Sequence, residues 1–340
     1  MTTIEEQVGQ VMAFGFDGVA LTPELKTMIE RLHPGGVVLF AHNIVSPQQL
    51  AQLDADLQRT ARANGSPDLI ISIDQEGGRV ARLKTETGFA EFPSARAVGE
   101  SREPEEQARQ IARAMAADLK AAGINMDLAP VLDVNNNPGN TVIGDRSFGA
   151  DPALVAQCGV AFIEAMQQEG IMAVGKHFPG HGDTAVDSHV ALPVVPHDRA
   201  RLESVEFVPF KAAIAAGVAG IMAAHVAFPA IEREAGRAGT LSKSVMTDLL
   251  RDEMGFGGIR LTDSLEMGAL ATRGYPVDIA AATALAAGAD LLLFNCGHEW
   301  NYRAHATLVD WVSRGKISPA RLAQAVRRVL AVKARFGVRK

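Results

Sequence analysis

The sequence predicts an α/β protein of the (β/α)8 TIM barrel class, folded as a single domain. Short apolar runs alternate along the chain with helical stretches, and eight such runs can be recognised. Alternation of this kind implies a parallel sheet, and eight units imply that the sheet closes into a barrel. The length of 340 residues suits one such barrel, and no linker rich in Pro, Ser or Gly divides the chain.

Local signals support each element in chain order. Thr3 and Glu6 form a capping-box pattern that opens the first helix, and Ser46 with Pro47 opens a later one. Glycines that can end a helix in the left-handed conformation precede most of the apolar runs. These glycines are Gly35, Gly36, Gly123, Gly170, Gly217, Gly220, Gly257, Gly258 and Gly288. The expected strands cover residues 11–14, 37–40, 69–73, 124–131, 171–174, 221–224, 259–261 and 291–294, and the clearest helices cover 104–122, 152–168 and 277–287.

A doubly wound open sheet is the alternative architecture for such an alternating chain. Its dinucleotide-binding version requires Gly-x-Gly-x-x-Gly after an early strand, and the sequence has none there. The last helical stretch, residues 319–336, is amphipathic and basic. We expect it to pack on the outside of the barrel with a solvated basic face rather than to bind a membrane.

Composition excludes several classes of partner. The 33 basic and 39 acidic side chains leave a net charge of −6, so no global positive field favours nucleic acid or an anionic membrane. Apolar residues make up 47% of the chain, which is ample for a large core. Aromatic residues make up only 5%, which disfavours an enzyme that stacks a long polymer and favours a small pocket. Trp300 is the only Trp near the predicted rim.

Two observations predict a cytoplasmic location. Cys158 and Cys296 cannot build a disulfide framework, and we expect both to be buried thiols. Glu5 and Glu6 stand where a secretory signal would need basic residues, and the longest apolar run, residues 212–224, is too short to span a bilayer.

Polar side chains follow six of the expected strands at their carboxyl ends. In a parallel barrel, these ends meet at one rim, where the active sites of such barrels are built. Buried polar groups need hydrogen-bonding partners, so a rim of this kind predicts a pocket that binds a ligand rather than a polar rim without a ligand. The residues are Asp74, Asp133, Lys176 with His177, His225, Asp263 and Asn295.

The loop 176–189 holds three His and two Asp, which suit either a metal site or an acid/base device. No zinc hydrolase signature such as H-E-x-x-H is present, so we expect no metal. Asp187 lies two residues before His189, close enough to orient the imidazole and raise its basicity. A serine hydrolase with Ser188 or Ser264 as nucleophile would need a Gly-x-Ser-x-Gly elbow, which is absent.

Asp263 ends a strand, and a rigidly delivered carboxylate has the placement of a covalent nucleophile. The alternative is a cap for the segment that follows it. Arg79, Arg82, Arg146 and Lys176 supply fixed positive charge and many hydrogen-bond donors. One strand-end carboxylate, one acid/base pair and many donors suit a neutral, hydroxyl-rich substrate.

Three segments, residues 73–80, 176–189 and 262–267, resemble those of the glycoside hydrolase family 3 β-N-acetylglucosaminidases. The resemblance extends from about residue 5 to 335 and is nearest to single-domain bacterial enzymes of cell-wall recycling. It implies one barrel domain over residues 1–340 that removes terminal, non-reducing N-acetylglucosamine by retaining, two-step hydrolysis. It also implies no metal or cofactor, and a small carbohydrate substrate such as an N-acetylglucosaminyl-anhydro-muropeptide or a chitooligosaccharide. We expect a monomer.

The resemblance also assigns roles to residues. Asp263 matches the nucleophile, His189 the general acid/base, and Asp187 its dyad partner. The matches for the groups that hold the sugar are Asp74, Arg82, Arg146, Lys176 and His177. Ser264 departs from the family pattern, because many relatives carry a second Asp there; we expect altered surroundings for the nucleophile rather than a different nucleophile.

Other functions fit part of this pattern. A phosphorylase of the same family would use phosphate in place of water, and a histidine acid/base does not exclude phosphate electrostatically. A non-catalytic sugar-binding barrel would need neither Asp263 nor His189. We further expect Gly180 and Gly182 to let the loop move His189 over the bound sugar.

Overall fold

Eight parallel strands form one sheet in the computed structural model, which describes residues 3–295 and 297–339. Their spatial order is β10-β1-β2-β3-β6-β7-β8-β9. A parallel bridge between Leu261 and Leu291 joins the two ends of this order, so the sheet closes into the predicted barrel. The strands are β1 (Met12–Phe14), β2 (Gly36–Leu39), β3 (Ile70–Ile73), β6 (Met126–Asp127), β7 (Met172–Phe178), β8 (Gly220–Ala223), β9 (Ile259–Thr262) and β10 (Leu292–Phe294).

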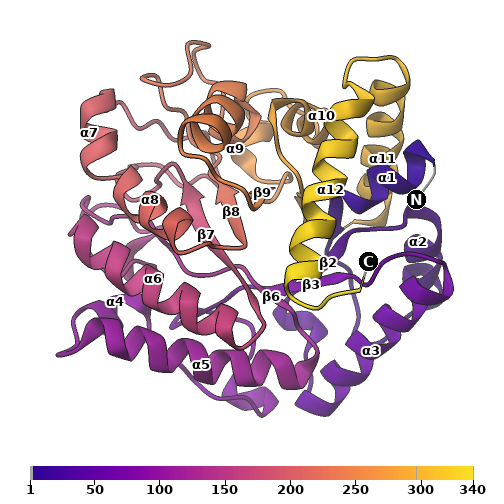
Figure 1. The fold of residues 1–340 in the computed structure, drawn as a ribbon, viewed down its shortest axis with the longest axis horizontal. Coiled ribbons are helices and arrows are strands. Elements are labelled where there is room, and N and C mark those ends of the chain that lie inside the picture. The colour runs from indigo at the N-terminus through magenta and orange to yellow at the C-terminus, as the bar shows by residue number, and fades with distance from the viewer. Residues whose placement is uncertain (1–2, 296, 340) are drawn as a thin grey trace.

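Helices surround the barrel, and α1 lies beside α12 although the two are at opposite ends of the sequence (Figure 1). A short hairpin, β4 (Gln75–Gly77) with β5 (Val80–Ala81), follows β3. The helices are α1 (Ile4–Gln10), α2 (Pro23–Leu32), α3 (Pro47–Ala63), α4 (Ala95–Gly99), α5 (Pro104–Ala122), α6 (Pro152–Gln168), α7 (Arg199–Ser204), α8 (Phe207–Ala215), α9 (Gly268–Ala271), α10 (Val277–Ala287), α11 (His298–Ser313) and α12 (Pro319–Arg335). A π-helical segment, η5 (Ser244–Glu253), precedes β9. Short 3₁₀ turns are η1 (Ala41–Asn43), η2 (Thr85–Thr87), η3 (Gly144–Arg146) and η4 (Gly239–Leu241).

The predicted helix ends are confirmed where capping chemistry is strong. The Thr3 hydroxyl accepts the Glu6 amide at 3.1 Å, and the Ser46 hydroxyl accepts the Gln49 amide at 3.2 Å. Gly123 ends α5 with φ of 91°, a conformation that other residues adopt only at a cost. The predicted bounds of α5, α6 and α10 agree with the structure.

Side chains of each strand alternate between two apolar layers. One layer fills the barrel interior, and the other lies between the strands and the helices. The interior layer holds Val38, Met172, Val174, Leu261 and Leu293, all nearly inaccessible to solvent. This alternation decides which strand-end residues face the interior.

Two strands differ in length from the prediction. The strand expected over 124–131 has a regular ladder only at Met126 and Asp127, and a single bridge from Val131 to Lys176 follows it. Pro130, which has no amide hydrogen to donate, lies between these two paired parts. β7 extends to Phe178, beyond the expected end at Val174, so Lys176 and His177 belong to the strand itself.

Helix α12 packs on the barrel as expected, but its basic side chains do not all lie on a solvated face. Val329 and Val332 join the interior apolar cluster. Arg321 and Arg328 both bind the buried carboxylate of Asp290, at 3.0 and 3.2 Å. The expectation of a solvated basic face was therefore wrong for these two arginines, since a buried carboxylate requires a partner.

Cys158 is buried, as predicted, whereas Cys296 lies outside the described residues. Among the helices of the described chain, none is both long and apolar enough to cross a bilayer.

Candidate active site

Four of the six strand ends deliver their polar residues to one pocket of about 530 Å³, whereas Asp133 and His225 are not among its lining residues. Lys176, Asp263 and Asn295 each stand two positions after an interior apolar residue, so the period-two alternation turns them toward the barrel axis. All eight predicted site residues line this pocket: Asp74, Arg82, Arg146, Lys176, His177, Asp187, His189 and Asp263.

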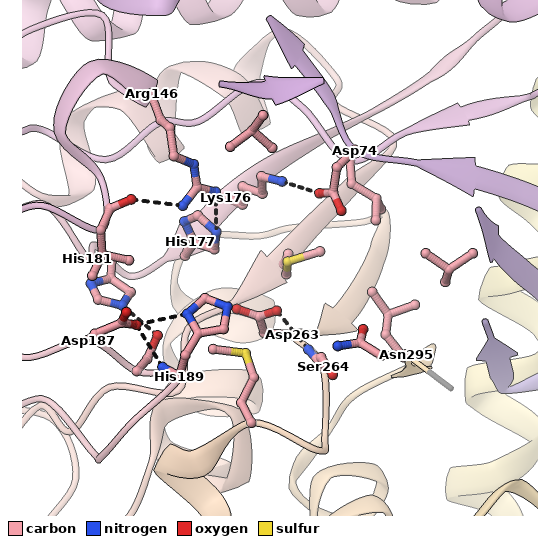
Figure 2. Close-up of a pocket in the computed structure, with 18 of the residues that line it drawn as sticks. Asp74, Arg146, Lys176, His177, His181, Asp187, His189, Asp263, Ser264 and Asn295 are labelled. Atoms are coloured by element: carbon pink, nitrogen blue, oxygen red, sulfur yellow. Dashed lines mark hydrogen bonds and ion pairs between the residues drawn. The ribbon is translucent and has the colours of Figure 1, made fainter. Parts of the chain in front are cut away.

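A buried network of charges forms one side of the pocket (Figure 2). The Lys176 ammonium lies 2.7 Å from Asp74 Oδ1 and 2.7 Å from Glu76 Oε1. Arg146 binds Glu76 through two parallel hydrogen bonds of 2.8 Å each, from Nε and Nη2. Arg82 approaches the other oxygen of Asp74 at 3.3 Å. Paired and bidentate contacts of this kind fix the positions of the cations.

The charges in this network keep Glu76 and Lys176 ionised. Burial alone would raise the pKa of Glu76, but the charges of Lys176 and Arg146 outweigh it and hold that pKa below the usual range. Burial likewise opposes the charged form of Lys176, yet Asp74 and Glu76 raise the pKa of its ammonium. The network therefore presents fixed donors and one carboxylate, Asp74, to the pocket.

His177 is held by Asp133, which lies beneath it and is fully buried. Asp133 Oδ2 is 2.7 Å from His177 Nδ1, and Asp133 Oδ1 accepts the backbone amide of His181 at 2.7 Å. Burial would raise the pKa of Asp133, but His177 overcomes this and lowers it. The other ring nitrogen of His177 is 3.4 Å from Arg146 Nη2 and faces the pocket. Asp133 thus orients a ligand-facing imidazole.

The predicted dyad forms on the opposite side of the pocket. His189 Nδ1 lies 2.8 Å from Asp187 Oδ1, and the same oxygen accepts the His189 backbone amide at 2.8 Å. The pKa of Asp187 is lowered: burial acts against this, but the His189 amide and ring outweigh it. In Figure 2, Asp263 lies beside the His189 ring, on the side away from Asp187.

Asp263 is held in its ionised form. Burial would raise the pKa of its carboxyl, but His225, His177 and the Ser264 amide together lower it. That amide donates to Asp263 Oδ1 at 2.7 Å. The Ser264 hydroxyl donates to Glu266 at 2.9 Å, and so it stabilises the turn rather than adding a second negative charge beside the nucleophile candidate.

His225 supports the same turn from below. It is fully buried, and its Nε2 donates to the Ser264 carbonyl at 2.8 Å, while Nδ1 lies 2.9 Å from the Thr240 hydroxyl. Burial lowers the pKa of His225, and the nearby charge of Asp263 opposes this shift. The sequence placed His225 at a strand end but did not indicate this supporting role.

The base of the loop that carries the dyad is tied by His181. Its two ring nitrogens bind the hydroxyls of Thr184 at 2.7 Å and Ser188 at 2.9 Å. A Cβ at Gly182 would lie 2.0 Å from the Val134 carbonyl oxygen, and one at Gly180 would lie 2.9 Å from Glu206 Cγ. Close backbone packing therefore explains Gly182, the positive φ of 143° explains Gly180, and a hinge role for both stays a prediction.

Among the described residues, the imidazoles of His177, His181 and His189 belong to no cluster of three or more potential metal ligands. A different trio, Asp183, His197 and Glu206, places ligand atoms within 4.8 Å of one another. Arg201 Nη2 already lies 3.8 Å from Asp183 and 3.3 Å from Glu206. The Arg201 guanidinium therefore already lies beside both carboxylates of this trio.

Sequence reasoning did not single out Glu76, His181 or Glu266. Glu76 follows Asp74 by two positions, so strand alternation was the signal that could have paired them. Trp300 does not belong to the lining residues of the described pocket. The Arg303 guanidinium carbon stacks over its ring, 5.3 Å from the ring centroid.

An eight-stranded barrel whose rim pocket combines a strand-end carboxylate with an aspartate–histidine dyad has the architecture of a barrel glycosidase. The family model described as "Glycosyl hydrolase family 3 N terminal domain" matches residues 3–332. The chain belongs to glycosyl hydrolase family 3, as the sequence motifs predicted.

Known relatives agree with this assignment. "Beta-hexosaminidase" of Nitrosomonas eutropha is 40% identical, and the match covers 81% of this chain and 78% of that protein. "Beta-hexosaminidase A" of Pseudoalteromonas piscicida is 36% identical, with 93% of this chain and 56% of that protein covered. The structure of a family 3 β-N-acetylglucosaminidase from Paenibacillus sp. FPU-7 superposes with a TM-score of 0.96 and 44% identity, over 99% of this chain and 63% of that one. The chain therefore spans less than two thirds of the length of two of these relatives.

Proposed function

We propose that the protein is an exo-acting, retaining β-N-acetylglucosaminidase that removes terminal, non-reducing N-acetylglucosamine. The observation that carries this proposal is the joint placement of an ionised Asp263 and the His189–Asp187 dyad in one pocket. The printed names of the relatives, beta-hexosaminidase and β-N-acetylglucosaminidase, support the same substrate class.

In the first step, the Asp263 carboxylate attacks the anomeric carbon while the glycosidic bond breaks. The protonated His189 imidazole gives its proton to the departing oxygen. In the second step, His189 takes a proton from water, the water oxygen attacks the anomeric carbon, and the bond to Asp263 breaks. Asp187 stabilises the imidazolium through its 2.8 Å contact with Nδ1. The net change is addition of water across the glycosidic bond with retained configuration.

The charged network opposite the dyad is proposed to hold the sugar. Asp74 faces the pocket with its orientation fixed by Lys176 and Arg82, and its oxygens can accept sugar hydroxyls. Arg146, Lys176 and His177 offer N–H donors to hydroxyl and N-acetyl oxygens. Such contacts bind a single terminal sugar without aromatic platforms, in keeping with the low aromatic content.

The natural substrate and its setting are part of the proposal. The small pocket suits a cell-wall muropeptide fragment or a chitooligosaccharide whose terminal sugar enters alone. We further propose a monomer with one barrel domain over residues 1–340, acting in the cytoplasm during peptidoglycan recycling. The small number of cysteines favours a reducing compartment. The two steps above use neither a metal nor a cofactor.

The test is hydrolysis of a chromogenic β-N-acetylglucosaminide, compared with the β-glucoside and the β-N-acetylgalactosaminide. We expect the first to be the best substrate and Asp263→Ala to lose nearly all turnover. Asp248→Asn, at an exposed carboxylate paired with Lys243, serves as a charge-matched control and should keep full activity. A wild-type enzyme that prefers the glucoside, or an active Asp263→Ala, would contradict the proposal. Release of N-acetylglucosamine 1-phosphate in phosphate buffer would identify the phosphorylase instead.

A further inference from the structure

The dyad segment rests on the short helix α9, which follows the nucleophile candidate in sequence. The Ala269 amide donates to the Ser188 carbonyl at 3.0 Å. This hydrogen bond fixes the residue that lies between Asp187 and His189. The first turn of α9 therefore supports the backbone that carries the proposed acid/base.

Gly268 provides the space for this contact. A Cβ built at Gly268 would lie 2.4 Å from the His189 carbonyl oxygen, 3.1 Å from its carbonyl carbon and 2.9 Å from the Val190 carbonyl oxygen. All three atoms belong to the backbone, so a side chain at position 268 cannot be accommodated by turning a neighbouring rotamer. Gly268 does not have a positive φ, so an L-residue is allowed there by its torsion angles. The close approach of the loop is the reason for glycine.

The position of the His189 ring depends strongly on its backbone. The side chain is 65% exposed, and Asp187 is its hydrogen-bond partner among the described residues. Asp187 belongs to the same loop, so it cannot hold the ring in place if the loop backbone moves. A shift of even 1 Å in a reacting group can cost about a hundredfold in rate.

The same segment also carries the nucleophile candidate. Asp263 lies five positions before Gly268, and the Met267 amide donates to the Ser264 carbonyl at 3.3 Å within the intervening turn. Residues 263–268 thus carry the proposed nucleophile at one end and, at the other, the glycine that contacts the backbone of His189. Figure 2 shows the side chains of Asp263 and His189 next to each other in the pocket.

We propose that Gly268 is a positioning residue, which sets the distance between the His189 acid/base and the Asp263 nucleophile by admitting the loop backbone onto α9. This inference rests on the proposed glycosidase function. A residue with a side chain at position 268 lifts His189 and Val190 away from α9. It impairs proton donation to the leaving oxygen, while Asp263 and the sugar-binding network keep their places.

The test compares Gly268→Ala with Gly257→Ala. Gly257 is exposed, has no positive φ, and a Cβ there would meet nothing within 4 Å, so it is a matched control. We measure kcat/KM for 2,4-dinitrophenyl and phenyl β-N-acetylglucosaminides, which have a good and a poor leaving group. Gly268→Ala should lose roughly 10- to 100-fold on the phenyl substrate and only a few-fold on the dinitrophenyl substrate, because only the poor leaving group needs the acid. Gly257→Ala should match the wild type on both.

A double-variant measurement separates displacement of His189 from a general loss of active-site structure. In a His189→Ala background, Gly268→Ala should cause no further loss on the phenyl substrate, because no acid remains to be displaced. Three results for kcat/KM of Gly268→Ala would overturn the inference: equal losses on both substrates, an undiminished loss in the His189→Ala background, or no loss at all. If Gly268→Ala does not fold, Ala269→Pro removes the amide that donates to Ser188, and the same substrate dependence is expected. An inactive wild type would instead refute the proposed function, whereas an active wild type with a normal Gly268→Ala refutes only the role of Gly268.

Discussion

Glu76 and Arg146 form a bidentate ion pair at the edge of the pocket, with both hydrogen bonds at 2.8 Å. Glu76 also binds Lys176, so one buried carboxylate stabilises two of the cations proposed to hold the sugar. Without this carboxylate, Arg146 would lose its bidentate partner and Lys176 would keep only Asp74, and the two like charges in a buried site would repel each other.

Glu76→Gln should therefore impair both stability and substrate binding. Breaking one partner of a buried ion pair typically costs about 3–5 kcal/mol, because the other charge stays buried without compensation. We expect an unfolding free energy lower by roughly this amount and a KM raised on the order of tenfold. Chemical denaturation and steady-state kinetics measure the two effects. Glu30→Gln, at an exposed pair with Lys26, should change stability by less than about 0.5 kcal/mol.

His189→Ala should slow the enzyme most with substrates whose leaving groups are poor. The imidazole donates a proton to the leaving oxygen, and a good leaving group departs without it. We expect a loss of about 100-fold or more on a phenyl glycoside and a much smaller loss on a dinitrophenyl glycoside. A series of aryl β-N-acetylglucosaminides gives the dependence of kcat/KM on the leaving group. Equal losses across the series would count against the acid/base role.

The barrel and most of the pocket were predictable from the sequence because they follow from period-two alternation. Once Val174 and Leu261 are placed in the barrel interior, Lys176 and Asp263 must face the same axis. Helix bounds were predictable where caps are strong, as at Ser46 with Pro47.

Contacts between residues distant in sequence were not predictable in this way. His225 binds the Ser264 carbonyl 39 positions later, and the contact of Gly268 with His189 depends on how a loop folds over a helix. Such contacts depend on tertiary packing, which leaves no periodic signal in the sequence. The inward turn of Arg321 toward Asp290 was missed for the same reason.

Acid should destabilise the protein partly through His181. Burial lowers its pKa to about 4, whereas an unfolded histidine titrates near 6.5. The neutral ring therefore contributes its full stability above pH 6.5, and this contribution is lost as pH falls toward 4, because the unfolded state takes up the proton first. A shift of this size corresponds to roughly 2–4 kcal/mol.

His181→Gln should remove this part of the pH dependence. The unfolding free energies of the variant and the wild type are compared between pH 7 and 4, and the expected result is a shallower slope for the variant, whatever its absolute stability. His42→Gln, at a half-exposed ring, is the control and should keep the wild-type slope. Parallel curves for His181→Gln and the wild type would contradict the assignment.

Asp54 should weaken the fold as pH rises. The side chain is 1% exposed on α3, and neither of its oxygens has a hydrogen-bond partner among the described residues. Burial raises the pKa of its carboxyl well above the usual value near 3.9. The unfolded state ionises first, so the wild type loses stability as pH climbs from about 4 until the folded-state pKa is passed. Asp54→Asn cannot ionise and should be the more stable protein at pH 8, by on the order of 1–3 kcal/mol, with the gap closing toward pH 4. Denaturant unfolding across this range gives the comparison, and Asp56→Asn removes the same charge from the same helix at a more exposed position. A gap that appears equally in Asp56→Asn would assign the effect to net charge rather than to the burial of Asp54.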